Sequence, residues 1–347
     1  MIDKGEIIMK PEEVKKIPLG LFPTPLQRMS NLERELGCGP LYIKRDDLSD
    51  LGLGGNKIRK LEYLVADAIQ QGCNTLLTYG GPQTNHGRLT VAAAVRNGMK
   101  SILILHGAKP DYLSGNLVLD KMMGADLYFT EGDGEEQKAL AQKVMAEYGA
   151  RGDKVYEIPV GGSNVLGALG YLMMIPELMK QLDEMGASAK YLVTGSGSLG
   201  TFCGLWAGAK YFRAGFEVVP ISVNPQTTFR EEQAAAFIRQ ISDAYSLGIT
   251  CDPGELKLQF GRGDVSYAGV AYNVPDAQTQ EAMHLLARTE AIFVDPCYTG
   301  KSFHGFVDLA QNVFPKGSGA IYLHTGGIPA IWTKEHLDAA QPVLAAY

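Results

Sequence analysis

The chain has 347 residues, of which 46% are hydrophobic and 20% charged, and this composition is typical of a packed globular protein rather than a disordered one. The formal net charge of −6 argues against broad electrostatic binding of nucleic acid, although a local basic cleft could still hold a phosphate. Glycine occurs 41 times, which indicates many tight turns or close approaches of the backbone to a ligand.

The five cysteines are scattered singly, which predicts reduced thiols rather than a disulfide framework or a metal site. They are Cys38, Cys73, Cys203, Cys251 and Cys297. No partner spacing supports nucleophilic use of Cys297, so we expect that thiol to be structural. The first residues contain no apolar signal core, and no apolar run approaches the roughly 18 residues that a bilayer requires. We therefore expect a cytoplasmic enzyme with no membrane segment.

Helical and strand patterns alternate from about residue 56 onward. In chain order we expect a helix over 61–69, a strand at 75–79, a helix over 85–96, a strand at 101–105, a helix over 115–123, a strand at 126–129, a helix over 135–148 and a strand at 155–160. The second half predicts strands at 191–194, 218–223 and 320–323, with helices over 201–212, 229–245, 276–288 and 302–313. This alternation predicts two α/β lobes with mainly parallel sheets and a shared cleft.

The first candidate for chemistry is a lysine beside a glycine pair. Lys57 follows Gly54–Gly55 at an expected helix start, and a Gly-Gly turn lets the backbone approach a ligand. The positive end of the helix, with neighbouring Arg59 and Lys60, would lower the pKa of Lys57 and favour the neutral amine that Schiff-base chemistry requires. On spacing alone, the alternative is that these three cations form a solvated basic face.

A second candidate lies at the start of the helix predicted over 85–96. Thr84, Asn85 and His86 follow a strand and a glycine pair, so the backbone N–H groups at this helix start could receive an anion such as a substrate carboxylate. The alternative is an ordinary helix cap, in which Thr84 or Asn85 satisfies the first turn and His86 is structural.

The third candidate is the glycine-rich loop 195–201. Its N–H groups and hydroxyls follow a strand and open a helix, which predicts a phosphate site. The loop also matches the G-x-G-x-x-G pattern of dinucleotide sites, but that pattern expects an acidic residue at the end of the next strand. Glu217 instead precedes the strand at 218–223, so a nicotinamide-dependent oxidoreductase is the weaker alternative.

Further candidates lie in the last quarter of the chain. Tyr272 and Tyr298, taken singly, are packing residues with a polar tip. Thr325 follows the strand at 320–323, where an α/β sheet usually presents ligand contacts. Lys301 is a second candidate for a Schiff-base lysine, but it lies inside an expected helix and lacks a preceding glycine pair.

Taken together, these motifs resemble the D-cysteine desulfhydrase and 1-aminocyclopropane-1-carboxylate (ACC) deaminase family. The segments in question are 54–62, 84–86, 195–201, 295–301 and 324–327, and the likeness runs from 22–26 to the C-terminal region. The resemblance implies a fold-type-II enzyme with pyridoxal 5′-phosphate as cofactor, similar to the tryptophan synthase β subunit. It implies two three-layer α/β/α domains with the cofactor cleft between them: residues 1–52 plus 162–347 as the large cofactor-binding domain, and 53–161 as the small substrate-carboxylate domain.

Carried over residue by residue, the resemblance assigns Lys57 to the covalent link with the cofactor and Asn85 to the pyridoxal hydroxyl. Thr84, Asn85 and His86 match the triplet that binds the substrate carboxylate. Its first member is usually serine and is a candidate for proton transfer, and threonine keeps the hydroxyl while restricting χ1. The phosphate cup corresponds to Gly197, Ser198, Leu199, Gly200 and Thr201; the two active-site tyrosines, catalytic and substrate-binding, correspond to Tyr272 and Tyr298; the residue facing the pyridine nitrogen corresponds to Thr325.

Three positions favour the desulfhydrases within this family. The deaminases resemble one another in having a glutamate directly after the second tyrosine, where this chain has Thr299. They also have a glutamine in the carboxylate-binding triplet, where this chain has His86. A hydroxyl at Thr325 cannot keep a pyridine nitrogen protonated as a carboxylate would, so the ring is a weaker electron sink. The resemblance therefore implies elimination of a good leaving group from Cβ, with D-cysteine giving pyruvate, ammonia and sulfide, rather than opening of a cyclopropane.

Several alternatives stay open at this point. L-cysteate sulfo-lyase or another β-eliminating lyase is the closest, and Arg262 is a candidate for extra contacts to a sulfonate. An ACC deaminase and a pyridoxal-phosphate carrier without turnover are others. The residue that removes the α-proton is Lys57 or Thr84, and the enantiomer is open. A homodimer is the expected assembly, with a small amino acid as substrate and no nucleic-acid or membrane partner.

Overall fold

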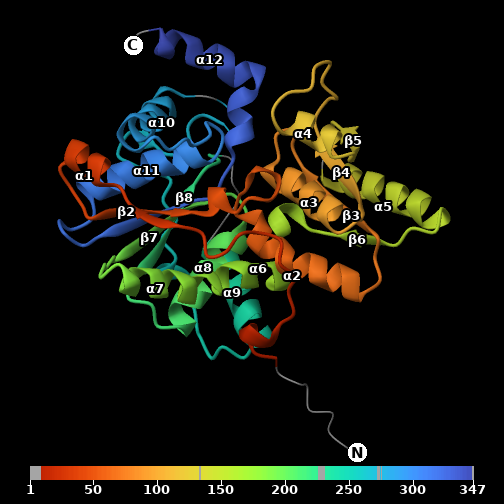
Figure 1. Ribbon diagram of the computed structural model, residues 1–347, viewed down its shortest axis with the longest axis horizontal. Coiled ribbons are helices and arrows are strands. Elements are labelled where there is room, and N and C mark those ends of the chain that lie inside the picture. Colours follow the sequence, from red (N-terminus) through yellow and green to blue (C-terminus); the bar gives the residue numbers. More distant parts are fainter. Residues whose placement is uncertain (1–8, 133, 226–230, 272–273, 275, 346–347) are drawn as a thin grey trace, which may run out of the picture.

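The computed structural model describes residues 9–132, 134–225, 231–271, 274 and 276–345. Two α/β bodies lie side by side, with the N-terminal and C-terminal parts of the chain in one and most of residues 57–157 in the other (Figure 1). Each body contains its own sheet. Among the described residues, no helix combines the length and apolar character that a membrane span needs.

The larger sheet has five strands in the order β1-β2-β11-β7-β8. They are β1 (Leu26–Arg28), β2 (Leu41–Arg45), β11 (Ala320–His324), β7 (Tyr191–Ser196) and β8 (Glu217–Ser222). All neighbours are parallel except β1, which pairs with β2 in antiparallel register. The carboxyl ends of β7 and β11 therefore lie at the same edge of the sheet.

Helices cover both faces of this sheet because its buried strands are apolar on both sides. Leu192 of β7 packs into the core of one face and Val193 into the core of the other, as successive side chains of a strand must. On the first face lie α6 (Val165–Leu172), α7 (Met174–Glu184), α8 (Leu199–Tyr211) and α9 (Glu231–Ala244); on the second lie α1 (Ser30–Leu36), α10 (Ala277–Glu290) and α11 (Thr299–Asn312).

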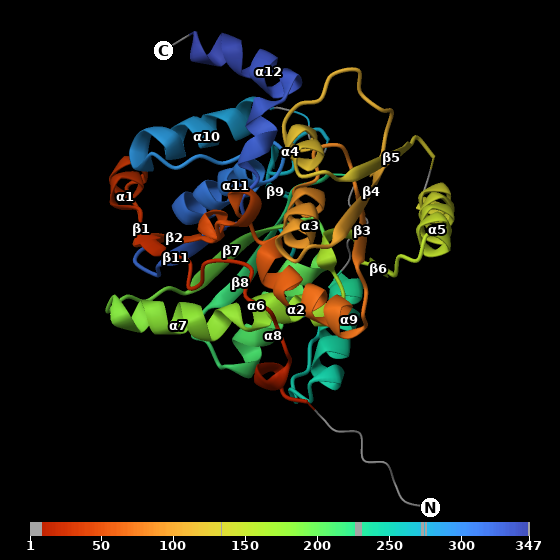
Figure 2. The same cartoon turned by 45° about the vertical axis from the view of Figure 1, so that its right-hand side comes forward.

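The smaller sheet is parallel throughout and has the order β5-β4-β3-β6. Its strands are β3 (Thr75–Gly80), β4 (Lys100–His106), β5 (Asp126–Thr130) and β6 (Val155–Glu157). One face packs on α2 (Lys57–Gln70), α3 (Asn85–Arg96) and α4 (Asn116–Met122), and the other on α5 (Gly134–Ala150), which lies alone beyond the strands in Figure 2. Leu76 and Leu77 of β3 point to these opposite faces.

Short elements complete the chain. They are the hairpin of β9 (Gly261–Arg262) and β10 (Val265–Ser266), the C-terminal α12 (Lys334–Leu344), and the 3-10 helices η1 (Pro11–Glu13), η2 (Asp46–Leu48), η3 (Leu51–Leu53), η4 (Val160–Gly162), η5 (Pro253–Glu255) and η6 (Ile328–Trp332).

The predicted fold class, two three-layer α/β/α bodies with mainly parallel sheets, is confirmed. The helix predicted over 85–96 has those bounds, whereas the one predicted over 302–313 begins earlier, at Thr299. The strand β2 and the helices α1, α6 and α7 were not predicted. The domain boundaries at 52/53 and 161/162 stay a prediction, since α2 packs against α3 of the small body and α6 of the large one.

Candidate active site

A cavity of about 290 Å³ lies where the carboxyl ends of both sheets meet. Eight of the predicted site residues line it: Lys57, Thr84, Asn85, His86, Gly197, Ser198, Tyr298 and Thr325. Leu199, Gly200 and Thr201 form the adjoining first turn of α8. The fold therefore brings together residues that are up to 268 positions apart in the chain, from Lys57 to Thr325. Tyr272 lies outside the described residues.

Lys57 is the first residue of α2, and its amine is held beside the cavity. Its Nζ donates to Asn56 Oδ1 at 2.9 Å, and Asn56 Nδ2 donates to Thr201 Oγ1 at 3.1 Å. Burial, together with the positive charge of Arg88, lowers the pKa of Lys57 from 10.5 to about 8. This direction agrees with the prediction, but the causes are burial and Arg88, whereas the sequence pointed to the helix start, Arg59 and Lys60.

Arg59 and Lys60 do not form a solvated basic face, because both side chains are buried. Arg59 forms ion pairs with Asp46 and Glu177, each at 2.8 Å, and does not line the cavity. Lys60 Nζ donates to the carbonyl of Gly161 at 3.0 Å, and burial holds its pKa well below the ordinary value.

The start of α8 forms a cradle that suits an anion. Ser198 is the N-cap of this helix and its side chain makes no capping hydrogen bond, so the first-turn N–H groups are left to other acceptors. A Cβ on Gly200 would lie 2.8 Å from both Lys60 Nζ and Ser163 Oγ, so any larger residue would displace these side chains. Ser163 Oγ accepts from the Gly200 N–H at 3.2 Å and donates to Ser198 Oγ at 2.8 Å.

Lys60 and Ser163 belong to this cradle and were not predicted as site residues. Ser163 lies in the segment 161–164, which the sequence marked only as a family segment. Lys60 had no usable sequence signal, since a lysine three residues after Lys57 on a helix is usually exposed. The combined cradle of helix N–H groups, hydroxyls and a buried amine is suited to a phosphate group.

The start of α3 combines a helix cap with backbone N–H groups suited to an anion. Thr84 Oγ1 accepts from the Gly87 N–H at 3.1 Å, so the cap interpretation is confirmed for Thr84. The N–H groups of Asn85 and His86 open the first turn and have no acceptor within the helix. Thr84 also lines the cavity, so capping does not remove it from the site.

His86 is neutral and its tautomer is set by its neighbour. Its Nε2 lies 2.8 Å from Thr78 Oγ1, and that hydroxyl donates its proton to the carbonyl of Ile158 at 2.8 Å. Nε2 must therefore bear the hydrogen, and Nδ1 is a bare acceptor. Burial and the charges of Lys57 and Lys60 hold the pKa of His86 well below its ordinary value. His86 thus contributes a dipole and its backbone N–H rather than a positive charge.

Tyr298 packs over the glycine-rich loop, which explains two of the loop's glycines. A Cβ on Gly195 would lie 2.8 Å from the Tyr298 ring, and one on Gly197 would lie 3.0 Å from it. Tyr298 Oη donates to the carbonyl of Gly195 at 3.1 Å, and burial raises the pKa of the phenol. Asp295 holds the backbone that bears this ring, because its Oδ1 accepts from the N–H groups of Cys297 and Tyr298.

The two threonines that favour a desulfhydrase occupy different places. Thr299 is buried outside the cavity, where its hydroxyl lies 2.5 Å from Asp295 Oδ2 and 3.1 Å from the carbonyl of Gly326. Thr325 lines the cavity itself. Within the described parts of the chain, no aspartate or glutamate lines this cavity.

Three other candidates lie elsewhere. Lys301 Nζ donates to the carbonyls of Ala268 and Ala271 at 2.7 and 2.6 Å, which removes it from the cavity and leaves Lys57 as the lysine there. Arg262 forms a two-pronged pair with Asp308 at 2.6 and 2.9 Å on the exposed hairpin, so it does not supply a sulfonate contact. Cys297 is buried, as expected of a structural thiol.

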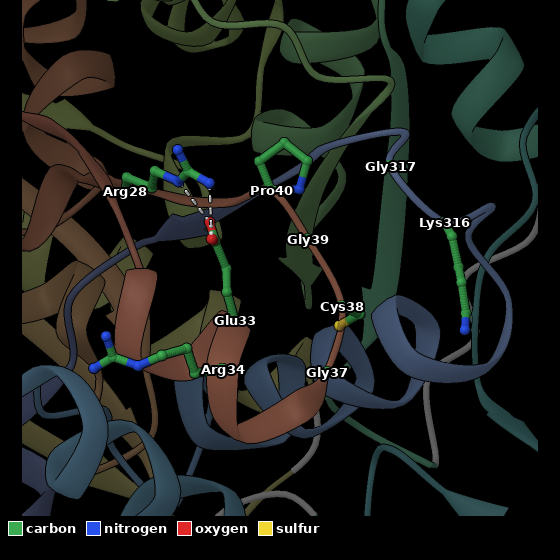
Figure 3. Close-up of a pocket in the computed structure, with 9 residues that line it drawn as sticks. All are labelled: Arg28, Glu33, Arg34, Gly37, Cys38, Gly39, Pro40, Lys316 and Gly317. Carbon is green, nitrogen blue, oxygen red and sulfur yellow. Dashed lines mark hydrogen bonds and ion pairs between the residues drawn. The ribbon is translucent and has the colours of Figure 1, made fainter.

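A second hollow of about 460 Å³ lies at the opposite edge of the large sheet, beside the amino ends of β2 and β11 (Figure 3). It is lined by Arg28, Glu33, Arg34, Gly37, Cys38, Gly39, Pro40, Lys316 and Gly317. Arg28 is paired with Glu33 within it, at 2.9 Å. None of the predicted site residues lies there.

Comparison with known proteins decides the family. A family model described as "Pyridoxal-phosphate dependent enzyme" matches residues 17–326, which is most of the chain. The chain belongs to this family. Within it, the chain is 37% identical to a D-cysteine desulfhydrase of Yersinia enterocolitica, covering 89% of this chain and 92% of that protein. It is also 37% identical to an ACC deaminase of Rhizobium leguminosarum, covering 92% and 96%.

Solved structures agree on the fold. A crystal structure of an ACC deaminase homologue superposes with a TM-score of 0.85 at 31% identity and covers 97% of both chains. A crystal structure of a T.th. threonine deaminase superposes with a TM-score of 0.62 at 16% identity, covering 88% of this chain and 92% of that one, and shows a shared fold alone. The chain is thus a fold-type-II pyridoxal-phosphate enzyme of the ACC deaminase and D-cysteine desulfhydrase family.

The residues of the cavity fit pyridoxal phosphate. The cradle at Gly200, which a single Cβ would fill, suits the phosphate, and the amine of Lys57 with its lowered pKa suits a link to the aldehyde. When bound, the cofactor supplies a ring that stabilises negative charge at the α-carbon of an amino acid. No group of three or more His, Cys, Asp or Glu side chains that could hold a metal occurs among the residues described.

Proposed function

We propose that the enzyme eliminates the β-substituent of D-cysteine, with water, to give pyruvate, ammonia and hydrogen sulfide. In this reaction the α-hydrogen and the thiolate leave the substrate, and water then replaces nitrogen at the α-carbon. Atoms balance without an oxidant or reductant. Arg262 and Lys301 have no role in this reaction, because both are paired away from the cavity.

In this proposal each residue has a role that follows from its position in the cavity. The free N–H groups at the start of α3, with the neutral His86, bind the substrate carboxylate. Lys57 Nζ and the Thr84 hydroxyl border the same cavity, and one of them removes the α-proton. The cradle of Gly197, Ser198, Leu199, Gly200 and Thr201 holds the phosphate, Asn85 holds the ring hydroxyl and Thr325 faces the ring nitrogen. Tyr298 and Tyr272 direct the leaving group.

The observation that supports this choice is the chemistry around Thr325. Its side chain is a neutral hydroxyl, and no carboxylate among the described residues lines the cavity to keep a pyridine nitrogen protonated. A pyridine ring without that proton withdraws electron density from the α-carbon less strongly. Loss of a good leaving group such as a thiolate is therefore favoured over cleavage of a carbon–carbon bond. Thr299, which stands where the deaminases have glutamate, is also neutral. Its hydroxyl is hydrogen-bonded to the carboxylate of Asp295 and to the carbonyl of Gly326.

The test is release of a 2-oxo acid from D-cysteine, L-cysteine, L-cysteate, D-serine and ACC, with sulfide measured in parallel. We expect D-cysteine to give pyruvate and sulfide in equal amounts and at the highest kcat/KM. Release of a 2-oxo acid from ACC at a higher kcat/KM would overturn the proposal in favour of ACC deaminase, the activity named for the Rhizobium relative. Preference for L-cysteate would favour the sulfo-lyase alternative, and bound cofactor without any release would indicate a carrier.

Assembly and location are part of the same proposal. We infer a cytoplasmic homodimer, in line with the free thiols of all five cysteines. Light scattering coupled to size-exclusion chromatography measures the mass of the assembly, for which we expect twice 37.5 kDa.

A further inference from the structure

Behind Asn85, away from the cavity, three side chains form a hydrogen-bonded row. Arg88 Nε donates to Asn116 Oδ1 at 2.8 Å, and Asn116 Nδ2 donates to Asn85 Oδ1 at 3.0 Å. Arg88 and Asn116 are both fully buried, whereas Asn85 reaches the cavity. Asn116 begins α4, and Asn85 begins α3, so the row joins two helix starts of the small body.

The direction of every hydrogen bond in this row is determined by chemistry. A guanidinium can only donate, so the atom of Asn116 that faces Arg88 must be the amide oxygen. The amide nitrogen of Asn116 then points the other way and also donates to the carbonyl of Gln83 at 2.8 Å, which can only accept. Asn85 must therefore present its oxygen to Asn116. Its own NH₂ group is then turned away from Asn116, with Nδ2 3.2 Å from where a Cβ on Gly327 would lie, and Asn85 itself lines the cavity.

The surrounding chain fixes Asn116 in place. Gln83 Oε1 accepts from the backbone N–H of Asn116 at 2.8 Å, and Gln83 Nε2 donates to the carbonyl of Ser114 at 3.0 Å. Gly115 has φ of 56°, and a Cβ there would lie 2.3 Å from Gln83 Oε1, so this turn requires glycine. Arg88 is likewise anchored by the carbonyls of Gly52 and Gly54.

We propose that Asn116 is a positioning residue, which turns the amide of Asn85 so that its NH₂ donors face the ring hydroxyl of the cofactor. Arg88 is the buried anchor that determines this direction. The inference rests on the proposed contact between Asn85 and the pyridoxal hydroxyl. If the amide were reversed, its carbonyl oxygen would face an oxygen that bears negative charge, and a charge-assisted hydrogen bond would become a repulsion.

Asn116 is a better place for the test than Arg88. Burial lowers the pKa of Arg88 to about 10, with Asp120 and Asp295 opposing that shift, and the charge of Arg88 also lowers the pKa of Lys57. Replacing Arg88 would thus change the reactive amine as well as the amide. Replacing Asn116 by aspartate keeps the size of the side chain and the oxygen that accepts from Arg88. It removes the NH₂ group that donates to Asn85 and to the carbonyl of Gln83. We expect Asn85 then to turn its NH₂ toward the new carboxylate and its oxygen toward the cofactor, because the remaining donor to Asn85 Oδ1, Arg88 Nη2, is 3.5 Å away and binds it weakly.

The experiment compares four variants of the full chain: Asn116→Asp, Asn116→Ala, Asn85→Ala and the double variant Asn85→Ala with Asn116→Asp. The dissociation constant of pyridoxal phosphate from each apoprotein and the pH dependence of the bound cofactor's absorbance are measured. Asn97→Asp is the matched control, because Asn97 Nδ2 also donates to a carbonyl, that of Ala93, at the other end of α3. Thermal melting of each apoprotein records any general loss of stability.

We expect Asn116→Asp to raise the dissociation constant about tenfold or more and to shift the absorbance titration, with Asn116→Ala intermediate and Asn97→Asp unchanged. In the Asn85→Ala background, Asn116→Asp should add less than about a twofold change, because it acts through Asn85. The inference is overturned if Asn85→Ala weakens binding while Asn116→Asp and Asn116→Ala do not, or if the two effects simply add. If Asn85→Ala itself leaves affinity and absorbance unchanged, it is the proposed contact of Asn85 with the cofactor that fails, and the inference falls with it.

Discussion

The Nζ atom of Lys57 donates a hydrogen bond of 2.9 Å to Oδ1 of Asn56. Asn56 in turn donates to Thr201 on the first turn of α8, so the amine of Lys57 and the proposed phosphate cradle are connected by one amide. The two ends of the proposed cofactor site are thus held at a set separation before any ligand arrives.

Replacement of Lys57 should abolish covalent capture of the cofactor. In Lys57→Ala, borohydride should leave no pyridoxyl label on the chain, and turnover should be lost. Peptide mass spectrometry of the reduced protein measures the label. Lys301→Met is the control, because Lys301 is also buried but donates only to backbone carbonyls away from the cavity; it should lower stability and keep the label. Full turnover by Lys57→Ala would contradict the assignment.

The rate at which the apoprotein captures pyridoxal phosphate should titrate near pH 8. Only the neutral amine attacks an aldehyde, and burial with the charge of Arg88 lowers the pKa of Lys57 to about 8. Below this pH the amine is protonated, so the rate should rise with pH and level off above about 8. Stopped-flow absorbance across pH 6 to 11 follows the capture. A rate that keeps rising toward the ordinary lysine pKa of 10.5 would show that the amine is not perturbed.

A methyl group at Gly200 should impair cofactor binding specifically. The added Cβ would lie 2.8 Å from Lys60 Nζ and from Ser163 Oγ, so the cradle must open. We expect Gly200→Ala to raise the dissociation constant of pyridoxal phosphate by tenfold or more. Gly208→Ala on the same helix is matched, since its Cβ would meet the carbonyl oxygen of Leu172 at 2.6 Å, far from the cradle. That control should lower the melting temperature and leave the dissociation constant unchanged.

Substitutions at Thr84 should separate its cap from its proposed chemistry. Thr84→Ala removes the acceptor for the Gly87 N–H, which should cost about 1 kcal/mol of unfolding free energy. It also removes the hydroxyl, and if this hydroxyl transfers the α-proton, kcat should fall by about 10²–10⁴. Thr84→Ser should restore both quantities. A variant Thr84→Ala with unchanged kcat would leave Lys57 as the base.

The buried pair of Arg59 and Asp46 should make the free energy of unfolding depend on pH in the acidic range. Burial opposes ionisation of Asp46, but the guanidinium of Arg59 outweighs it and lowers the pKa from 3.8 to about 2. Because the folded pKa lies below the unfolded one, this stabilisation is complete above about pH 4 and is lost as the pH falls toward 2. Arg59→Leu should cost about 3–5 kcal/mol at pH 7, since it leaves the fully buried Asp46 without its ion-pair partner, whereas Glu177 keeps its pair with Lys44.

Denaturant melts at pH 7 and at pH 3 test that prediction. The difference in unfolding free energy between the protein and Arg59→Leu should shrink at the lower pH. Arg45→Leu is a useful comparison, because Arg45 pairs with Asp47 at 2.7 Å nearer the surface and should cost less. A larger loss for Arg45→Leu than for Arg59→Leu would contradict the ranking.

The sequence by itself determined the class of fold and most of the site. Periodicity and turn residues predict β3, α3 and α8 because these elements follow local rules of burial and capping. The spacing of glycines and lysine around position 57, and of residues 84–86, identifies the family, since those motifs are short and contiguous. The strand β2 was not predicted, because its pairing with β11 joins residues about 280 positions apart, for example Leu41 with Ala320.

Only the tertiary structure decided which charges are buried and which residues stand behind the site. Arg59 and Lys60 resemble surface residues in the sequence, and their burial follows from the packing of α2 against α6. The sequence left Arg262 as a candidate for a substrate contact, and only the structure shows that it is paired with Asp308. Burial lowers the pKa of Lys57 and the charge of Arg88 adds to that shift, and Arg88 also helps to set the direction of the Asn85 amide. Arg88 is 31 residues from Lys57 and 3 residues from Asn85. Electrostatics and hydrogen-bond direction are properties of distances in space, and a sequence does not contain those distances until the chain has folded.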